Sequence, residues 1–180
     1  FMSEQGYKRI GLLGASLGTV RVIIAQAKNQ DPRVTAVIAV GALRFSHEYY
    51  LQSEMANLHK KHYEEAKALV GAGKGDTIIR TDFPNSGGIF TAEVHLDRHC
   101  SEHYDITKLY SDKITCPMLI LTGTEEKHPR MLDCGRDIAA LVGDKNPGFR
   151  WVNVEGGDHG LHSFEERFNE EVMSFLGAKE

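Results

Sequence analysis

The residue types that could carry out chemistry begin with a serine between two glycines. Residues 14–18 read Gly-Ala-Ser-Leu-Gly, a GxSxG sequence that follows an apolar stretch and precedes an amphipathic one. A tight turn from strand to helix needs small flanking residues and holds the serine hydroxyl out at the end of the sheet. The sequence therefore predicts Ser16 as a nucleophile, with the backbone N–H of Leu17, at the start of the helix, as an oxyanion donor.

A histidine and two glutamates supply the groups that such a serine needs. A serine hydroxyl is a poor nucleophile until a base takes its proton, and a carboxylate orients that base and stabilises its charged form. His159 lies in a Gly-Asp-His-Gly loop near the end of the chain, and Glu125 and Glu126 lie in a loop that precedes it. We predict His159 as the base, and the residue types alone leave both glutamates open as the acid.

The elements that must position these residues are short apolar strands that alternate with helices. The alternation predicts a mostly parallel sheet of about four strands with helices on both faces, an α/β fold. The carboxyl ends of parallel strands share one edge of the sheet, so the serine, acid and histidine loops are expected together. The predicted buried strands are 7–15, 34–40, 116–122 and 149–154, and the predicted helices between and after them are 17–29, 131–142 and 163–176.

A segment richer in charge, histidine and tyrosine interrupts this alternation. We predict a single domain over 1–180, within which 43–112 is a cap-like insertion over the strand ends. Its expected elements are a helix over 47–70, stopped by the glycine-rich run 71–75, and a second helix over 91–103. A short strand is expected at 77–81 and a loop at 84–88.

The order of these motifs resembles the α/β-hydrolase family, from its nucleophile strand onward. In that family the nucleophile comes first, then an acid after a later strand, then a histidine after the last strand. The resemblance places the acid three residues after the glycine that ends its strand, which selects Glu126 over Glu125. It implies a serine hydrolase that cleaves a carboxylic ester or thioester of a small molecule through an acyl-enzyme on Ser16, with no cofactor.

The resemblance covers only the later part of the family's fold. The family has about eight strands, and an early loop supplies a second oxyanion N–H. Here the nucleophile strand opens the sequence, so we expect it to be a sheet edge that pairs with a second copy of the chain or with a missing N-terminal half. The alternative is a catalytically incompetent, truncated domain that binds a small ligand or a partner chain.

Composition excludes several other classes of protein. A net charge of -4 without a basic run gives no reason to expect nucleic acid as a partner. No run of about 18 apolar residues predicts a membrane span, and the start lacks the order of a signal peptide. The three cysteines form no CxxC pair. We therefore predict reduced thiols and a cytoplasmic protein.

Two weaker patterns compete with the hydrolase prediction. Gly11, Gly14 and Gly18 have the spacing GxxGxxxG rather than the GxGxxG of a dinucleotide site, and no acidic residue ends the next strand. His95, His99 and His103 recur every four residues. Two of these histidines could chelate zinc on a helix, but we interpret the stripe as a polar helix face and predict no metal site.

Overall fold

The computed structural model describes residues 4–83 and 87–177, and it divides the chain into two compact units. The first, which we call the sheet unit, comprises residues 1–44 and 106–180, and the second, the insertion unit, comprises residues 45–105. The insertion unit is shorter than the predicted segment 43–112. The reason is that helix α6 (Ile106–Leu109) and the short helix η1 (Ser111–Lys113) contact helices of the sheet unit.

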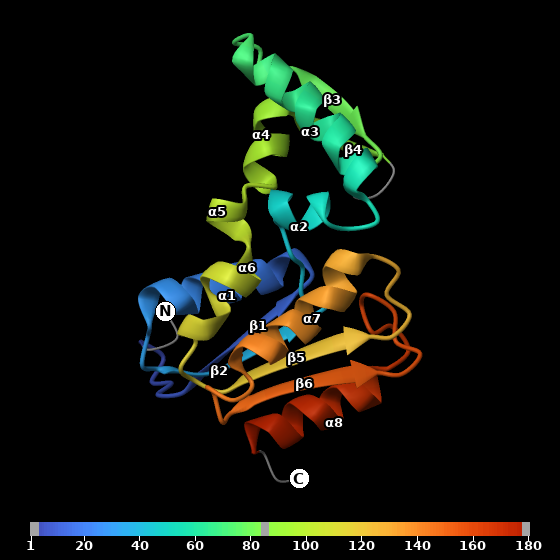
Figure 1. The fold of residues 1–180 in the computed structure, drawn as a ribbon. Helices are drawn as coiled ribbons and strands as arrows, with labels where there is room; N and C mark the ends of the chain where they lie inside the picture. Colours follow the sequence, from blue (N-terminus) through green and yellow to red (C-terminus); the bar gives the residue numbers. More distant parts are fainter. Residues whose placement is uncertain (1–3, 84–86, 178–180) are drawn as a thin grey trace. The chain divides into compact units, whose positions relative to one another are not determined.

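The sheet unit is a four-stranded parallel sheet in the order β1-β2-β5-β6, so the predicted α/β fold class is confirmed. In Figure 1, α1 and α7 lie on one side of this sheet and α8 lies on the other. The strands are β1 (Ile10–Ala15), β2 (Val34–Val40), β5 (Met118–Gly123) and β6 (Phe149–Val154), and the helices are α1 (Leu17–Asn29), α7 (Pro129–Val142) and α8 (Glu165–Leu176).

An aliphatic core holds the strands of the sheet unit against α8. Buried side chains of β2 and β5, among them Ile38, Leu119 and Leu121, pack with Leu161 and with the inward face of α8. Each fully buried aliphatic side chain of this kind contributes about 1.5–3 kcal/mol. Because this burial fixes the strand register, it also fixes where the loops after the strands lie.

The prediction of a fully buried first strand is wrong. β1 pairs with β2 alone among the described residues, and its Leu13 is 51% exposed. Tyr7, just before the strand, is 57% exposed. A strand at the edge of a sheet leaves one row of backbone N–H and C=O groups open, which explains why apolar residues in β1 remain accessible.

The insertion unit consists of helices of 4 to 16 residues and a two-stranded antiparallel sheet. Its elements are α2 (His47–Leu51), α3 (Ala56–Gly71), β3 (Ile78–Thr81), β4 (Gly88–Thr91), α4 (Ala92–Arg98) and α5 (Ser101–Tyr104). The loop predicted over 84–88 lies partly outside the described residues, and β4 begins at its last residue.

Both long helices predicted for the insertion unit are interrupted. The helix predicted over 47–70 breaks between α2 and α3, where the Ser53 hydroxyl donates to the Tyr50 carbonyl and accepts from the Met55 N–H. Such local bonds compete with helical ones. The helix predicted over 91–103 breaks at Cys100, whose backbone is extended.

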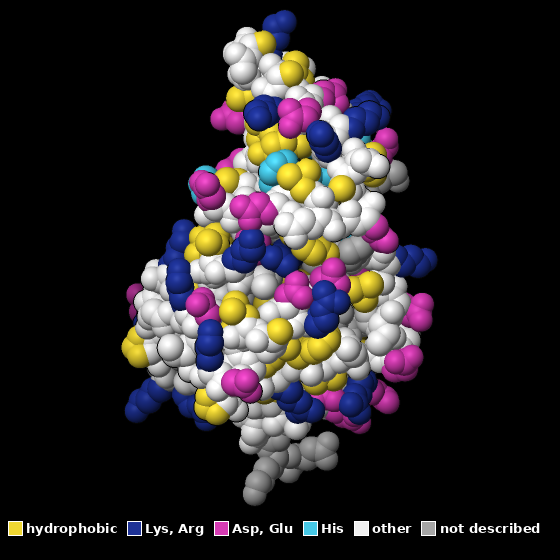
Figure 2. Space-filling model, viewed as in Figure 1, with side chains coloured by type: hydrophobic (Ala, Val, Ile, Leu, Met, Phe, Trp, Pro, Cys, Tyr) yellow, Lys and Arg dark blue, Asp and Glu magenta, His cyan; other side chains and the backbone are white. Residues whose placement is uncertain are grey.

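The visible surface carries both signs of charge. Figure 2 shows lysine and arginine side chains interspersed with aspartate and glutamate over both parts of the molecule. Among the described residues, no helix has both the length and the apolar character needed to cross a bilayer.

Candidate active site

Ser16 occupies a strained turn between β1 and α1. Its backbone has φ 51° and ψ -122°, a region that residues other than glycine rarely adopt. The Ser16 N–H donates to the Val40 carbonyl at 2.9 Å, which ties the turn to the end of β2. A Cβ atom on Gly14 would lie 2.4 Å from the Gly18 carbonyl oxygen, so the close approach of strand and helix requires the glycine at position 14.

His159 connects Ser16 to a buried carboxylate. The Nε2 atom of His159 lies 2.9 Å from the Ser16 Oγ atom, and its Nδ1 atom is hydrogen-bonded to Oε1 of Glu126. With the proton on Nδ1, the imidazole donates to the carboxylate and accepts from the serine hydroxyl. The side chain of Glu126 is 2% exposed, whereas that of His159 is 39% exposed. The arrangement allows a proton to move from the serine to a histidine that is open to solution.

The structure places Glu126, and not Glu125, beside the histidine. Glu125 is exposed, and its backbone N–H donates to the Gly157 carbonyl at 2.9 Å. That bond joins the loop after β5 to the loop after β6. The approach of the two loops is close enough that a Cβ atom on Gly123 would lie 2.1 Å from the Gly157 carbonyl oxygen.

Gly41 is a residue of this site that the sequence analysis did not identify. It directly follows β2 with φ +57°, and its N–H donates to the Leu121 carbonyl at 2.9 Å. A Cβ atom there would lie 2.9 Å from Nδ1, Cε1 and the carbonyl oxygen of His159. Any side chain at position 41 would therefore displace the imidazole. The sequence places a glycine directly after the predicted strand 34–40, but it does not show that this glycine lies against His159.

Leu17 is the first residue of α1, as predicted, and its side chain is 44% exposed. The first N–H groups of a helix have no partner within the helix and carry its partial positive charge. The N–H of Leu17 therefore has the chemistry of an oxyanion donor next to Ser16.

The histidine stripe does not form the polar face that the sequence predicted. His95 and His99 are fully buried, because α4 packs against α3. His103 alone is exposed and lies 3.4 Å from Asp97. Within residues 4–83 and 87–177, no group of three or more histidine, cysteine, aspartate or glutamate residues could hold a metal ion.

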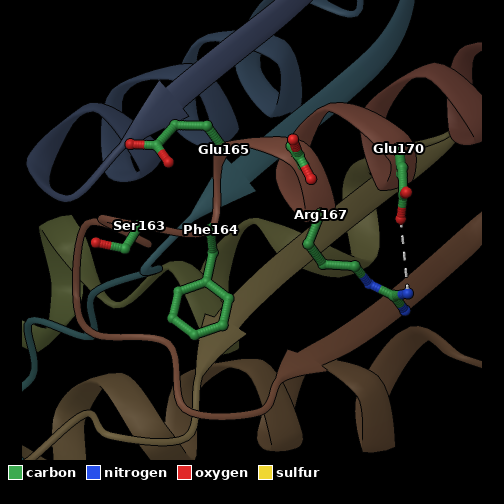
Figure 3. Close-up of a pocket in the computed structure, with 6 residues that line it drawn as sticks. Ser163, Phe164, Glu165, Arg167 and Glu170 are labelled. Carbon is green, nitrogen blue, oxygen red and sulfur yellow. Dashed lines mark ion pairs between the residues drawn. The ribbon is translucent and has the colours of Figure 1, made fainter.

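A separate surface pocket lies at the start of α8. Figure 3 shows its lining residues, with Arg167 paired to Glu170 at 3.8 Å. It encloses about 490 Å³ and is lined by Ser163, Phe164, Glu165, Glu166, Arg167 and Glu170. None of Ser16, Glu126 and His159 lines it, so the pocket does not extend the candidate site.

Known structures share the fold of this chain, although no family model and no curated protein matches it. The monoacylglycerol lipase of Paleococcus ferrophilus aligns over 97% of this chain and 70% of its own, with a TM-score of 0.66 and 17% identity. The α/β hydrolase MGS-MChE2, from the metagenome of lagoon sediments of Mar Chica, Morocco, aligns over 98% of this chain and 65% of its own (TM-score 0.58, 16% identity).

A third neighbour agrees with these two. Est1E from Butyrivibrio proteoclasticus, in a structure with ferulic acid bound, aligns over 97% of this chain and 63% of its own, with a TM-score of 0.59 and 17% identity. The chain thus spans between 63% and 70% of the lengths of these three proteins. It has an α/β-hydrolase-like fold.

Proposed function

We propose that this protein is a serine hydrolase that cleaves a carboxylic ester or thioester of a small molecule through an acyl-enzyme on Ser16. The observation that carries the proposal is the hydrogen-bonded series from Ser16 Oγ through His159 to Glu126. The strained backbone of Ser16 supports it, because such strain is typical of a nucleophile at a strand-to-helix turn.

In the first half of the proposed reaction, His159 accepts the serine proton while Oγ bonds to the acyl carbon. The resulting oxyanion accepts a hydrogen bond from the backbone N–H of Leu17. When the bond from the acyl carbon to the leaving oxygen or sulfur breaks, His159 returns the proton to that atom. Glu126, buried beside Nδ1, stabilises the imidazolium that forms in between.

In the second half, water replaces the alcohol or thiol. His159 takes a proton from the water as its oxygen bonds to the acyl carbon. Collapse of this second tetrahedral intermediate breaks the bond to Ser16 Oγ, which takes the proton back from His159. The products are a carboxylic acid and the free enzyme, and no step requires a metal or an organic cofactor.

The structural neighbours support the ester class for this proposal. One of them is a monoacylglycerol lipase and another is an α/β hydrolase enzyme. At 14–21% identity the neighbours share the fold, and the substrate must be determined for this chain directly.

A second candidate function is binding without catalysis. The observation that favours it is the open edge of β1, where Leu13 is 51% exposed. An open edge of this kind pairs readily with another strand. We propose a second copy of the chain or a separate N-terminal half as the partner there, and in this candidate Ser16 is unreactive.

Covalent labelling with a fluorophosphonate probe separates the two functions. Intact mass spectrometry should find one adduct on the wild-type protein and none on Ser16→Ala, and hydrolysis of an activated ester should fall by about 10⁴-fold or more. Ser163→Ala is the matched control, because Ser163 also has a positive φ of 65° but lies outside the hydrogen-bonded series. It should label like the wild type. Folded wild-type protein without an adduct would overturn the hydrolase proposal in favour of binding.

A further inference from the structure

The interior of the insertion unit is built from histidines. Six of the nine histidines of the chain lie within residues 45–105. His59, His95 and His99 are fully buried, and His62 is 3% exposed. Histidine is intermediate in burial preference, so three inaccessible imidazoles in one small unit are unusual. We call these three residues the buried histidines.

The buried histidines share one aromatic core. The ring centroids of His95 and His99 are 4.7 Å apart, and those of His59 and His99 are 5.5 Å apart. Phe83 packs against His59 at 4.8 Å and against Tyr50 at 4.6 Å. Because these rings contact one another across α2, α3 and α4, a change in charge on one of them acts on the whole interior of the unit.

Several ring nitrogens in this core have no hydrogen-bond partner. These are Nδ1 of His59, both nitrogens of His95 and Nε2 of His99. The remaining nitrogens are bonded within the unit: His59 Nε2 lies 2.8 Å from Nδ1 of His47, and His99 Nδ1 donates to the His95 carbonyl at 2.8 Å. A protonated imidazole carries an N–H on both nitrogens. Protonation would therefore bury charged donors without acceptors, which is strongly unfavourable.

Burial is the main cause that lowers the pKa of each buried histidine, and neighbouring histidine and arginine side chains act in the same direction. Burial lowers the pKa of His59 to about 3, assisted by His47 and His95, and lowers that of His95 to about 4, assisted by His62 and Arg98. Burial also lowers the pKa of His99 to about 2, against the opposing effect of its bond to the His95 carbonyl.

Carboxylates of the unit lie near His47 and His62. Burial lowers the pKa of His47, with Lys67 acting in the same direction and Glu64 and Glu48 opposing it. Glu65 lies 3.6 Å from Nδ1 of His62. The ring centroid of Tyr63 lies 5.4 Å from that of His59. Burial raises the pKa of Tyr63, and Cys100 and Glu64 act in the same direction.

We propose that the insertion unit is a pH-sensitive module. It is closed, meaning folded around its core, while its buried histidines are neutral. It opens, meaning that it unfolds locally, when mildly acidic solution protonates them, at a pH at which the sheet unit remains folded. The proposal is independent of the hydrolase activity, since it depends only on residues 45–105. It assigns a regulatory property to a part of the chain whose chemistry the proposed reaction does not use.

The direction of the pH dependence follows from proton binding. Each buried histidine has a lower pKa in the folded unit than the 6.5 expected when the unit is open. The unit therefore has its full stability above about pH 6.5 and loses it as the pH falls towards about 4. Three such groups lower the equilibrium constant for closing by up to about a thousandfold per pH unit in this range.

The sheet unit lacks a comparable core of histidines among its described residues. Its buried histidine among the described residues is His128, 7% exposed. His162 is exposed, and its hydrogen bond to Asp158 raises its pKa, so His162 contributes stability below its unfolded pKa of about 6.5. His159 is partly exposed beside Glu126. The two units should therefore respond differently to acid.

Hydrogen–deuterium exchange of the full chain between about pH 7.5 and about pH 4.5, corrected for intrinsic rates, tests the proposal. Peptides from 45–105 should lose protection first as the pH falls. The steepness with which the opening equilibrium changes with pH should correspond to an uptake of about three protons at its midpoint. Fluorescence of Trp151, the single tryptophan, reports on the sheet unit through β6 and should not change at that pH. Loss of protection in both units at one pH, or none in the insertion unit, would overturn the proposal.

His95→Leu provides the decisive variant, because both ring nitrogens of His95 lack a partner. Proton uptake on opening should fall from about three to about two, and the midpoint should move to lower pH by about half a unit. His103→Leu, at an exposed position, is the matched control and should behave as the wild type. Should His95→Leu fail to close at neutral pH, NMR titration of the wild-type histidine rings decides. Neutral rings until opening support the proposal, and ordinary titration near pH 6.5 without opening refutes it.

Discussion

The two units of this chain achieve a packed interior by different means. The sheet unit buries aliphatic side chains between its strands and α8, whereas the insertion unit buries imidazole rings among phenylalanine and tyrosine. Aliphatic groups do not titrate, so the stability that they contribute to the first interior does not change with pH, although the sheet unit also buries Glu126, His128 and Glu171. The second depends on the neutrality of groups whose unperturbed pKa lies close to physiological pH. The titratable groups that a unit buries thus decide how its stability depends on pH.

The candidate chemistry lies entirely within the sheet unit. Ser16, Glu126 and His159 follow three of its strands, and Gly41 follows the fourth. Parallel strands whose core is rigid bring loop residues from distant parts of the sequence to within hydrogen-bond distance. The variants below test whether the candidate chemistry depends on the sheet unit and the proposed pH response on the insertion unit.

After Ser16→Ala, the largest effect is expected for the carboxylate beside His159. Glu126→Gln keeps the size of the side chain but removes the charge that stabilises the imidazolium, so ester hydrolysis should fall by about 10³–10⁴-fold. The turnover number with an activated ester measures this, and circular dichroism confirms that the variant is folded. Glu125→Gln is the matched control and should change turnover less than about twofold. A large loss in the control instead would show that the acid has been misassigned.

Smaller changes are expected from one cavity in each core. Leu119→Ala removes a fully buried side chain of the sheet unit and should lower its free energy of unfolding by about 2–5 kcal/mol. Ile79→Ala, 4% exposed in the insertion unit, should act on that unit instead. Hydrogen exchange resolved by peptide distinguishes them. If either variant weakened both units equally, the two interiors would form one cooperative structure and the comparison would fail.

The smallest effect is expected at Gly41. Gly41→Ala adds a methyl group 2.9 Å from the imidazole of His159 at a positive φ, so turnover should fall by about ten- to a hundredfold through displacement of the base. The KM should change little, because the substitution moves a reacting group rather than a binding one. Gly11→Ala, where a Cβ meets nothing within 4 Å, serves as the control. Equal losses in the two variants would assign the effect to general destabilisation.

Elements with strong local signals were predictable from the sequence. The bounds of α1, β2 and β6 agree with those predicted, because apolar periodicity and terminating glycine or proline residues mark them. The break at Ser53 was not predictable, since it depends on side-chain bonds that compete with a helix that the pattern otherwise favours. The short strand β4 carried too little pattern to be distinguished from a loop.

What the sequence determined by itself is the set of reactive residue types and their order along a strand–helix alternation. From these follow the α/β class and the expectation that Ser16, His159 and a glutamate after the third strand share one edge of the sheet. The residue types left both glutamates open and the family resemblance selected Glu126, which contacts His159 in the structure. The tertiary structure alone decided that Gly41 makes room for the imidazole and that His95 and His99 turn inward. The reason is physical: types and periodicity are local properties, whereas contact and burial depend on which distant segments pack together.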